Sequence, residues 1–250
     1  MSFIINPYRF SAASSFPHTK AISLDWSTEW MANTTTNTIG IADTWTVNIW
    51  FNINSFTNAN RLLYIHAWTN VNSIQVLTNA ADSSVRIVTL DPSSVKIKDY
   101  ISSNTLSTAT NYMYTFTWDG TTLNIYQNAS LDGSPTKNDD AAWTMTDTAR
   151  RIGVWATDSW SDPTDWEICR TDIWNVVLDS ANITELYNSW NGYQRDNRNA
   201  VWNYDQQAAL KHQWALGLNS SNIWADYVSS WGINIWTNAS NIDASDIVTF

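Results

Sequence analysis

The chain has few charged residues, and basic residues are especially scarce. Only 14% of its 250 residues are charged, with 13 Lys and Arg against 23 Asp and Glu, so the net charge is −10. No run of three or more Lys or Arg is present, which disfavours nucleic-acid binding, because that binding depends on neutralising phosphates. An anionic membrane surface would also repel the chain.

Cysteine and long apolar runs are scarce as well. Cys169 is the only cysteine, which excludes an internal disulfide and favours assembly in a reducing cytoplasm. We expect its side chain to act as a small buried apolar group. No stretch approaches 18 consecutive apolar residues, and residues 1–17 lack the basic start and apolar run of an export signal. We therefore expect neither membrane insertion nor export.

The chain is rich in uncharged polar residues and in tryptophan. The chain contains 28 Asn, 27 Ser, 29 Thr and 17 Trp, a composition suited to surfaces that pack by shape and hydrogen bonds. Apolar residues make up 44% of the sequence, which is enough to bury a sizeable core and excludes a disordered tail. The length is typical of a single large β domain.

Alternation of apolar and polar residues dominates residues 40–175 and predicts strands. The strongest pair is Asn111–Trp118 and Thr121–Gln127, joined by Asp119-Gly120, which predicts a hairpin with a two-residue type I′ turn. One face of its first strand is aromatic throughout: Tyr112, Tyr114, Phe116 and Trp118. Further strands are expected at Trp45–Phe51, Leu62–Ala67, Ser73–Thr78, Ser84–Leu90 and Ser94–Lys98.

The order of these segments predicts the fold class. Short strands about ten residues apart, with no long helical periodicity between them, are typical of an antiparallel two-sheet sandwich or jelly roll. One short helix is expected at Leu178–Tyr187, with Ser180 or Asn182 as its N-cap. Residues 191–210 are polar and irregular and are expected to form a surface linker. We therefore predict an all-β protein with one short helix.

Four sequence blocks resemble one protein family in their order and spacing. The block from Tyr112 to Tyr126 is similar to the aromatic hairpin of laminin-G-like domains in the concanavalin A-like lectin/glucanase superfamily. Three further blocks match the same domains: Ala21–Asp25, Trp45–Phe51 and Ile168–Asn188. The resemblance implies a jelly-roll domain over residues 21–190, with an N-terminal arm at residues 1–20 and a C-terminal extension at residues 191–250.

Both ends of the chain carry a second resemblance. Residues 4–10, Leu210–Gly217 and Ala225-Asp226 are similar to segments of laminin-G-like proteins encoded by tailed phages. This implies a virion structural protein, a capsid decoration or appendage subunit, assembled in the host cytoplasm. The implied partners are other virion proteins, such as the major capsid protein, and further copies of this chain. The extension would supply edge strands either to its own sandwich or to a neighbouring subunit. The expected assembly residues are Tyr8, Arg9, Phe10, Trp214, Trp224, Trp231 and Trp236.

The sequence lacks a pair of carboxylates suited to glycosidic hydrolysis. Enzymes of the resembled superfamily carry a Glu-x-Asp-x-(x)-Glu strand, whereas Glu29, Glu167 and Glu185 have no such spacing. The three histidines lie far apart in the chain and near no nucleophile motif: His18, His66 and His212. We therefore expect a protein that is not an enzyme.

A Pro-containing loop at residues 157–165 carries three carboxylates: Asp158, Asp162 and Asp165. Hard oxygen ligands are those that Ca²⁺ selects, and laminin-G-like domains often bind calcium at a loop rim. Solvated loop acids are the alternative interpretation. No other cofactor is expected.

The same region is rich in tryptophan: Trp143, Trp155, Trp160 and Trp166. Exposed Trp faces stack on sugars, and nearby Asn and Asp can bind hydroxyl groups, which indicates a glycan-binding platform. The alternative function is therefore a carbohydrate-binding adhesin. Trp is also highly buried on average and enriched at interfaces, so core or interface positions are the other interpretation of these residues.

Overall fold

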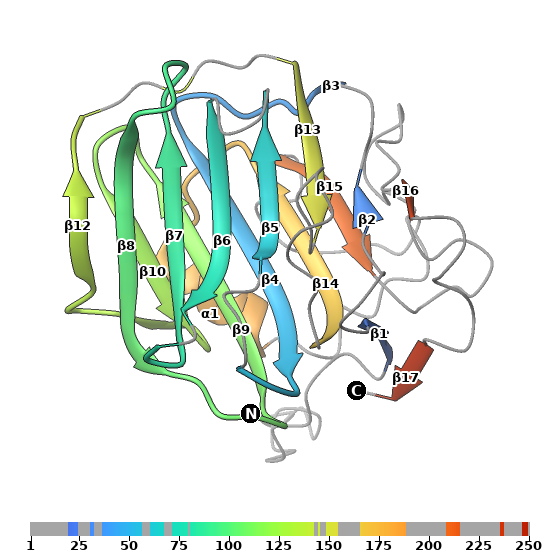
Figure 1. The fold of residues 1–250 in the computed structure, drawn as a ribbon. Coiled ribbons are helices and arrows are strands. Elements are labelled where there is room, and N and C mark those ends of the chain that lie inside the picture. The colour runs from blue at the N-terminus through green and yellow to red at the C-terminus, as the bar shows by residue number, and fades with distance from the viewer. Residues whose placement is uncertain are drawn as a thin grey trace, which may run out of the picture.

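The computed structural model of the chain describes residues 20–24, 31–32, 37–56, 61–67, 72–79, 81–142, 145, 149–154, 166–188, 209–215, 236–237 and 247–249. These residues form two antiparallel sheets that lie face to face, with one helix beyond the rear sheet (Figure 1). The predicted all-β sandwich with one short helix is confirmed. Within these ranges, no helix combines the length and the apolar character needed to cross a membrane.

Sheet A, at the rear in Figure 1, has the strand order β11-β10-β9-β4-β14-β1-β17, and β15 also pairs with β14. The edge of β14 opposite β4 is shared, because β1 pairs with its first half and β15 with its second half. The strands are β1 (Lys20–Leu24), β4 (Trp45–Ile53), β9 (Asn111–Trp118), β10 (Leu123–Gln127), β11 (Ser130–Leu131), β14 (Trp166–Trp174), β15 (Leu210–Ala215) and β17 (Ile247–Thr249).

Sheet B, at the front, has the order β12-β8-β7-β6-β5-β13-β2-β16, and β3 also pairs with β13. Strand β12 forms one edge of this sheet. The strands are β2 (Met31–Ala32), β3 (Asn37–Thr38), β5 (Arg61–His66), β6 (Ser73–Asn79), β7 (Ser84–Leu90), β8 (Lys96–Thr105), β12 (Thr136–Asp140), β13 (Ala149–Val154) and β16 (Trp236–Thr237).

The main core fills the space between the sheets. Alternate residues of each strand point inward because successive strand residues face opposite sides of a sheet. The predicted aromatic face of β9 is confirmed, since all four of its residues lie in this core: Tyr112, Tyr114, Phe116 and Trp118. They pack with Trp45, Val47, Ile49 and Phe51 of β4, with which β9 pairs.

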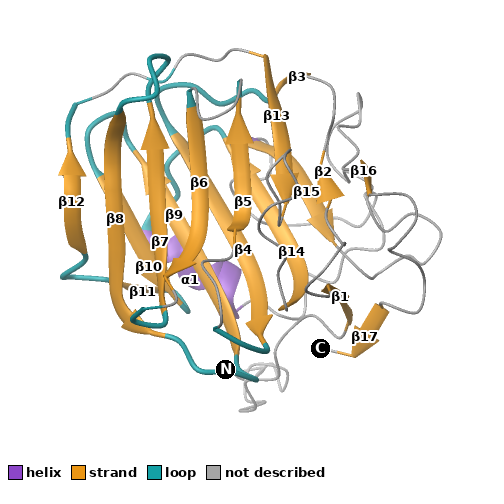
Figure 2. Ribbon diagram, viewed as in Figure 1, coloured by secondary structure: helices purple, strands orange, loops and turns teal. Residues whose placement is uncertain are grey.

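A second apolar layer lies on the other face of sheet A. The helix α1 (Ser180–Asn188) packs there, behind the strands in Figure 2, and buries Ile183 and Leu186 against Trp50 and Trp174. Cys169 also belongs to this layer, as expected, and burial raises the pKa of its thiol.

Thr46 and Asp179 fix the entry to α1. The Thr46 hydroxyl donates to the Val176 carbonyl at 2.8 Å and accepts from the Leu178 N–H at 2.9 Å. The Asn182 N–H donates to Asp179 Oδ1 at 2.8 Å, so the N-cap is Asp179. The prediction of Ser180 or Asn182 is wrong because the helix starts at Ser180, directly after this carboxylate.

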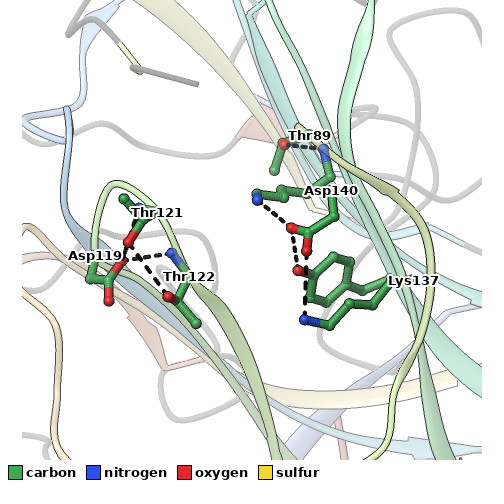
Figure 3. Close-up of polar contacts among 8 residues, drawn as sticks. Thr89, Asp119, Thr121, Thr122, Lys137 and Asp140 are labelled. Carbon is green, nitrogen blue, oxygen red and sulfur yellow. Dashed lines mark hydrogen bonds and ion pairs between the residues drawn. The ribbon is translucent and has the colours of Figure 1, made fainter. Parts of the chain in front are cut away.

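The β9–β10 hairpin is confirmed, but its predicted two-residue turn is wrong. Trp118 pairs with Leu123, so residues 119–122 form a four-residue loop. The carboxylate of Asp119 accepts from the N–H groups of Thr121 and Thr122 at 2.8 and 2.6 Å (Figure 3). Gly120 alone in this loop has a positive φ, of 94°, whereas a type I′ turn needs two such residues.

The described parts of the C-terminal extension belong to the sandwich of their own chain. Strands β15, β16 and β17 pair with β14, β2 and β1 respectively. Trp214 of β15 was expected at a subunit interface, but its side chain is fully buried in the main core and its ring stacks on His212. The assignment of Trp214 to assembly therefore needs correction, because its surface is already covered within the chain.

Candidate functional site

Most residues predicted to bind ligands or to serve assembly lie outside the described residues. This applies to Trp143, Trp155 and Trp160, to Asp158, Asp162 and Asp165, to Tyr8, Arg9 and Phe10, and to Trp224 and Trp231. Trp166 begins β14, where it pairs with Leu24 and Ile53, and Trp236 pairs with Ala32 in sheet B. The glycan platform and the calcium site therefore stay predictions. The part of the chain that the structure describes contains no group of three or more His, Cys, Asp or Glu residues placed to hold a metal ion.

The outer face of sheet B carries a row of aromatic and polar side chains. Tyr64, Gln75, Val88 and Asp99 are successive cross-strand neighbours on β5, β6, β7 and β8. They face outward because the residues next to them along the strands, such as Ile65, Ile74, Ile87 and Tyr100, belong to the main core. All four residues of this row are buried, and at its β5 end the Tyr64 ring stacks on that of His66 at a ring distance of 4.1 Å.

A charged group lies where this row reaches the β12 edge. Asp99 accepts from Arg86 Nε at 2.6 Å, Arg86 Nη2 at 2.5 Å and Lys96 Nζ at 3.0 Å. Asp139 of β12 lies directly opposite Asp99 in the register, so the two side chains share the outer face. We call these four residues, Arg86, Lys96, Asp99 and Asp139, the outer patch.

The electrostatics of the outer patch are dominated by the pairing of Asp99 with its two cations. Burial alone would raise the pKa of Asp99, but the hydrogen bonds from Arg86 and Lys96 outweigh it and hold that pKa below its usual value. The bond to Asp99 likewise raises the pKa of Arg86, and Asp139 adds to this effect. Asp99 is therefore ionised at neutral pH, with its lone pairs engaged by the protein.

Apolar side chains border the outer patch. Leu77 and Ile101 lie on either side of Arg86 in the register, on β6 and β8, and both are partly exposed. Lys96 keeps 46% of its side chain exposed, whereas Asp99 keeps 1%. The patch thus presents charged donors and one acceptor, Asp139, beside apolar surface. This combination can bind hydroxyl groups and the apolar face of a ring.

A second polar group lies on the inner side of the same sheet edge. Tyr100 donates to Asp140 Oδ1 at 2.5 Å, Lys98 Nζ contacts the same oxygen, and Lys137 Nζ lies 3.7 Å from Oδ2 (Figure 3). The two ammonium groups also lie over aromatic rings, Lys98 over Trp118 at 5.2 Å and Lys137 over Tyr100 at 4.8 Å. We call these residues, Lys98, Tyr100, Lys137 and Asp140, the inner cluster.

Neither the outer patch nor the inner cluster was predicted from the sequence. A signal was present, since the segment 96–100 places two lysines and an aspartate within five residues of a chain that is only 14% charged. The missing information was the partner strand, because Asp139 and Asp140 meet this segment only through the pairing of β12 with β8.

The sequence of residues 28–184 matches the family model described as the concanavalin A-like lectin/glucanases superfamily. The chain belongs to this superfamily. No curated protein sequence matches the chain significantly. Members of the superfamily share the two-sheet architecture seen here, so the family match and the fold agree.

Solved structures show the same fold. A putative carbohydrate binding protein from Bacteroides ovatus is 16% identical with a TM-score of 0.58, and the match covers 88% of this chain and 58% of that protein. A heptameric pentraxin from Limulus polyphemus is 12% identical with a TM-score of 0.51, and the match covers 69% of this chain and 83% of that protein. The chain thus spans little more than half of the Bacteroides protein. At these identities the likeness extends to the fold alone.

Proposed function

We propose that this superfamily member is a non-catalytic carbohydrate-binding protein and that its ligand contacts the outer patch. The observation that carries the proposal is the buried Asp99 carboxylate, held by Arg86 and Lys96 beside the partly exposed side chains of Leu77 and Ile101. The lectin-like family and the fold likeness to a putative carbohydrate binding protein support it.

The chemistry of the outer patch suits a sugar. Lys96 can donate to a ring hydroxyl, and Asp139 can accept from one. Hydrogen bonds to charged groups are stronger than those between neutral groups. The fixed Arg86–Asp99 pair orients the donors before the ligand arrives, which lowers the ordering entropy lost on binding. Leu77 and Ile101 offer apolar surface for the C–H face of the ring.

The same geometry favours binding over hydrolysis. A glycosidase needs one carboxyl group that is protonated and can act as the general acid. In the outer patch the cations lower the pKa of Asp99 instead, and the carboxylate is covered by the protein. Asp99 is therefore a poor proton donor to a leaving group.

Lys96→Ala tests the site, with Lys137→Ala as a matched control. Both lysines keep 46% of their side chains exposed and both pair with an aspartate three residues later, but Lys96 lies in the outer patch and Lys137 in the inner cluster. On a glycan array, followed by titration calorimetry with the best ligand, we expect Lys96→Ala to weaken binding by about tenfold and Lys137→Ala by less than about twofold.

Other outcomes of this experiment would place the binding site elsewhere in the chain or contradict the proposed function. Equal losses in both variants would exclude a specific role for the outer patch. Binding that persists in Lys96→Ala but is lost when Trp155 and Trp160 are both replaced by Ala would favour the Trp-rich segment at residues 143–166 as the platform. Absence of binding to every glycan by the wild-type protein would contradict the proposed function.

A second candidate function is that of a virion surface protein. The likeness of residues 4–10 and 210–226 to phage-encoded laminin-G-like proteins favours this proposal. It includes assembly in the host cytoplasm, contacts with the major capsid protein and a homo-oligomeric state. It is compatible with sugar binding, because a decoration protein can also bind glycans. We expect mass spectrometry of purified particles to detect the protein, and its absence from particles would exclude this role.

A further inference from the structure

We propose that Asp140 is a positioning residue for the outer patch: through the inner cluster it holds β12 against β8, and so keeps the neighbouring Asp139 in contact with the ligand. This inference rests on the proposed carbohydrate binding. It assigns to Asp140 a role in a site that its own side chain does not face.

Two consecutive aspartates of β12 face opposite sides of sheet B. In the strand register, Asp139 lies opposite Asp99 on the outer face. Asp140 lies opposite Lys98, whose side chain points inward over Trp118. The register shifts between Lys137 and Asp139, and this bulge at Asn138 brings Lys137 and Asp140 to the same inner side. In a regular strand, residues three apart would face opposite ways.

Within the part of the chain that the structure describes, strand β12 has few other attachments. Among the described strands it lies at the edge of sheet B and pairs with β8 alone, and its residues are exposed except for the partly buried Asp139. A short, bulged edge strand gains little from its backbone ladder, and such segments open at low free energy. The position of Asp139 therefore depends on contacts made by its neighbours, and Asp140 makes the largest number of them.

The contacts of Asp140 reach deep into the sandwich. Lys98 keeps 3% of its side chain exposed and Tyr100 keeps 1% of its surface exposed. The charged groups that face Asp140 are Lys98 from β8 and Lys137 from β12, and the titratable Tyr100 also comes from β8. Strand β9 contributes the uncharged Trp118 beside Lys98. A buried ammonium group strongly favours a carboxylate neighbour.

Acid should weaken the attachment of β12 to β8, because the pKa of Asp140 is lowered in the folded protein. Hydrogen bonds from Lys98 and Tyr100 lower that pKa. A carboxylate whose pKa is lowered by folding stabilises the fold above its unfolded-state pKa and loses this effect as the pH falls through the lowered value. Strand β12 is therefore held throughout the neutral range and released only in acid.

Hydrogen exchange combined with ligand titration tests the proposal in the full chain. In Asp140→Asn we expect amides of residues 136–140 to exchange at least about tenfold faster, with unchanged protection in β6 and β7. Affinity for the best array ligand should fall about threefold to tenfold. Lys137→Ala removes a longer ion pair with Asp140 and a contact with the Tyr100 ring, so it should change both quantities less than Asp140→Asn does.

Two further variants separate positioning from direct contact. Asp139→Asn should lower affinity while leaving the exchange rates of β12 unchanged. Tyr100→Phe keeps all charges and should accelerate exchange of β12 to a smaller degree, which keeps the test available if Asp140→Asn does not fold. Unchanged exchange in β12, or faster exchange with full affinity, would overturn the inference. If the wild-type protein binds no glycan, the proposed function fails, while faster exchange would still establish Asp140 as the residue that holds β12.

Discussion

Replacing Asp172 by Ala lowers the free energy of unfolding by about 3–5 kcal/mol, because it removes one member of a buried ion pair. Asp172 accepts from Arg170 Nε at 2.6 and 2.8 Å and from Gln213 Nε2 at 2.9 Å. Asn48 lies next to it on β4 and contacts its second oxygen at 3.4 Å. All these side chains are buried on the face of sheet A that points away from the main core. Water therefore cannot replace the lost carboxylate without a rearrangement.

Urea denaturation measures this effect, with Asp43→Ala as the control. Asp43 is exposed, and its replacement should change the free energy of unfolding by less than about 0.5 kcal/mol. A loss below about 1 kcal/mol in Asp172→Ala would show that the buried charges are easily hydrated, contrary to their burial in the structure.

Replacing Trp214 by Ala lowers the free energy of unfolding by about 3–5 kcal/mol through the cavity that it leaves in the main core. The side chain is fully buried between the sheets, and its strand β15 pairs with β14. Because the lost contacts lie within one chain, the destabilisation should be the same at every protein concentration.

Thermal unfolding at several protein concentrations distinguishes this role from assembly. If Trp214 served a subunit interface, the difference in Tm between the variant and the wild type would grow with concentration. Val95→Ala is the matched control, since 56% of Val95 is exposed and its loss should be nearly neutral.

Strands with regular alternation could be predicted from the sequence. The β4 and β9 strands carry large apolar residues at every inward position, and their other face is polar apart from Trp50 and Met113. Period-two alternation therefore predicts both the strands and the side that enters the main core. The predicted bounds at Ser84–Leu90 are those of β7. The strand predicted at Ser94–Lys98 instead runs from Lys96 to Thr105, because residues 99–105 are largely polar and are held by pairing with β7 and β12.

Strand β12 could not be predicted from the sequence. The outer patch could not be predicted either, because one of its members, Asp139, lies on this strand. Its sequence, Thr-Lys-Asn-Asp-Asp, has no apolar residue and no strand preference. It becomes a strand because β8 offers a free edge and Lys98 and Tyr100 bind Asp140. Contacts of this kind join residues about forty positions apart, and neither local propensity nor periodicity reports them.

The shared edge of β14 has a consequence for how the protein folds. Strands β1 and β15 divide that edge between them, and β1 in turn pairs with β17, joining Lys20 to Thr249. The strands of sheet A therefore cannot all pair until residues 247–249 have left the ribosome. Pairings this distant in sequence make folding slow, and a nascent chain that ended near residue 190 would expose one half of a central strand. The order of synthesis thus favours chaperone binding before the last strands arrive.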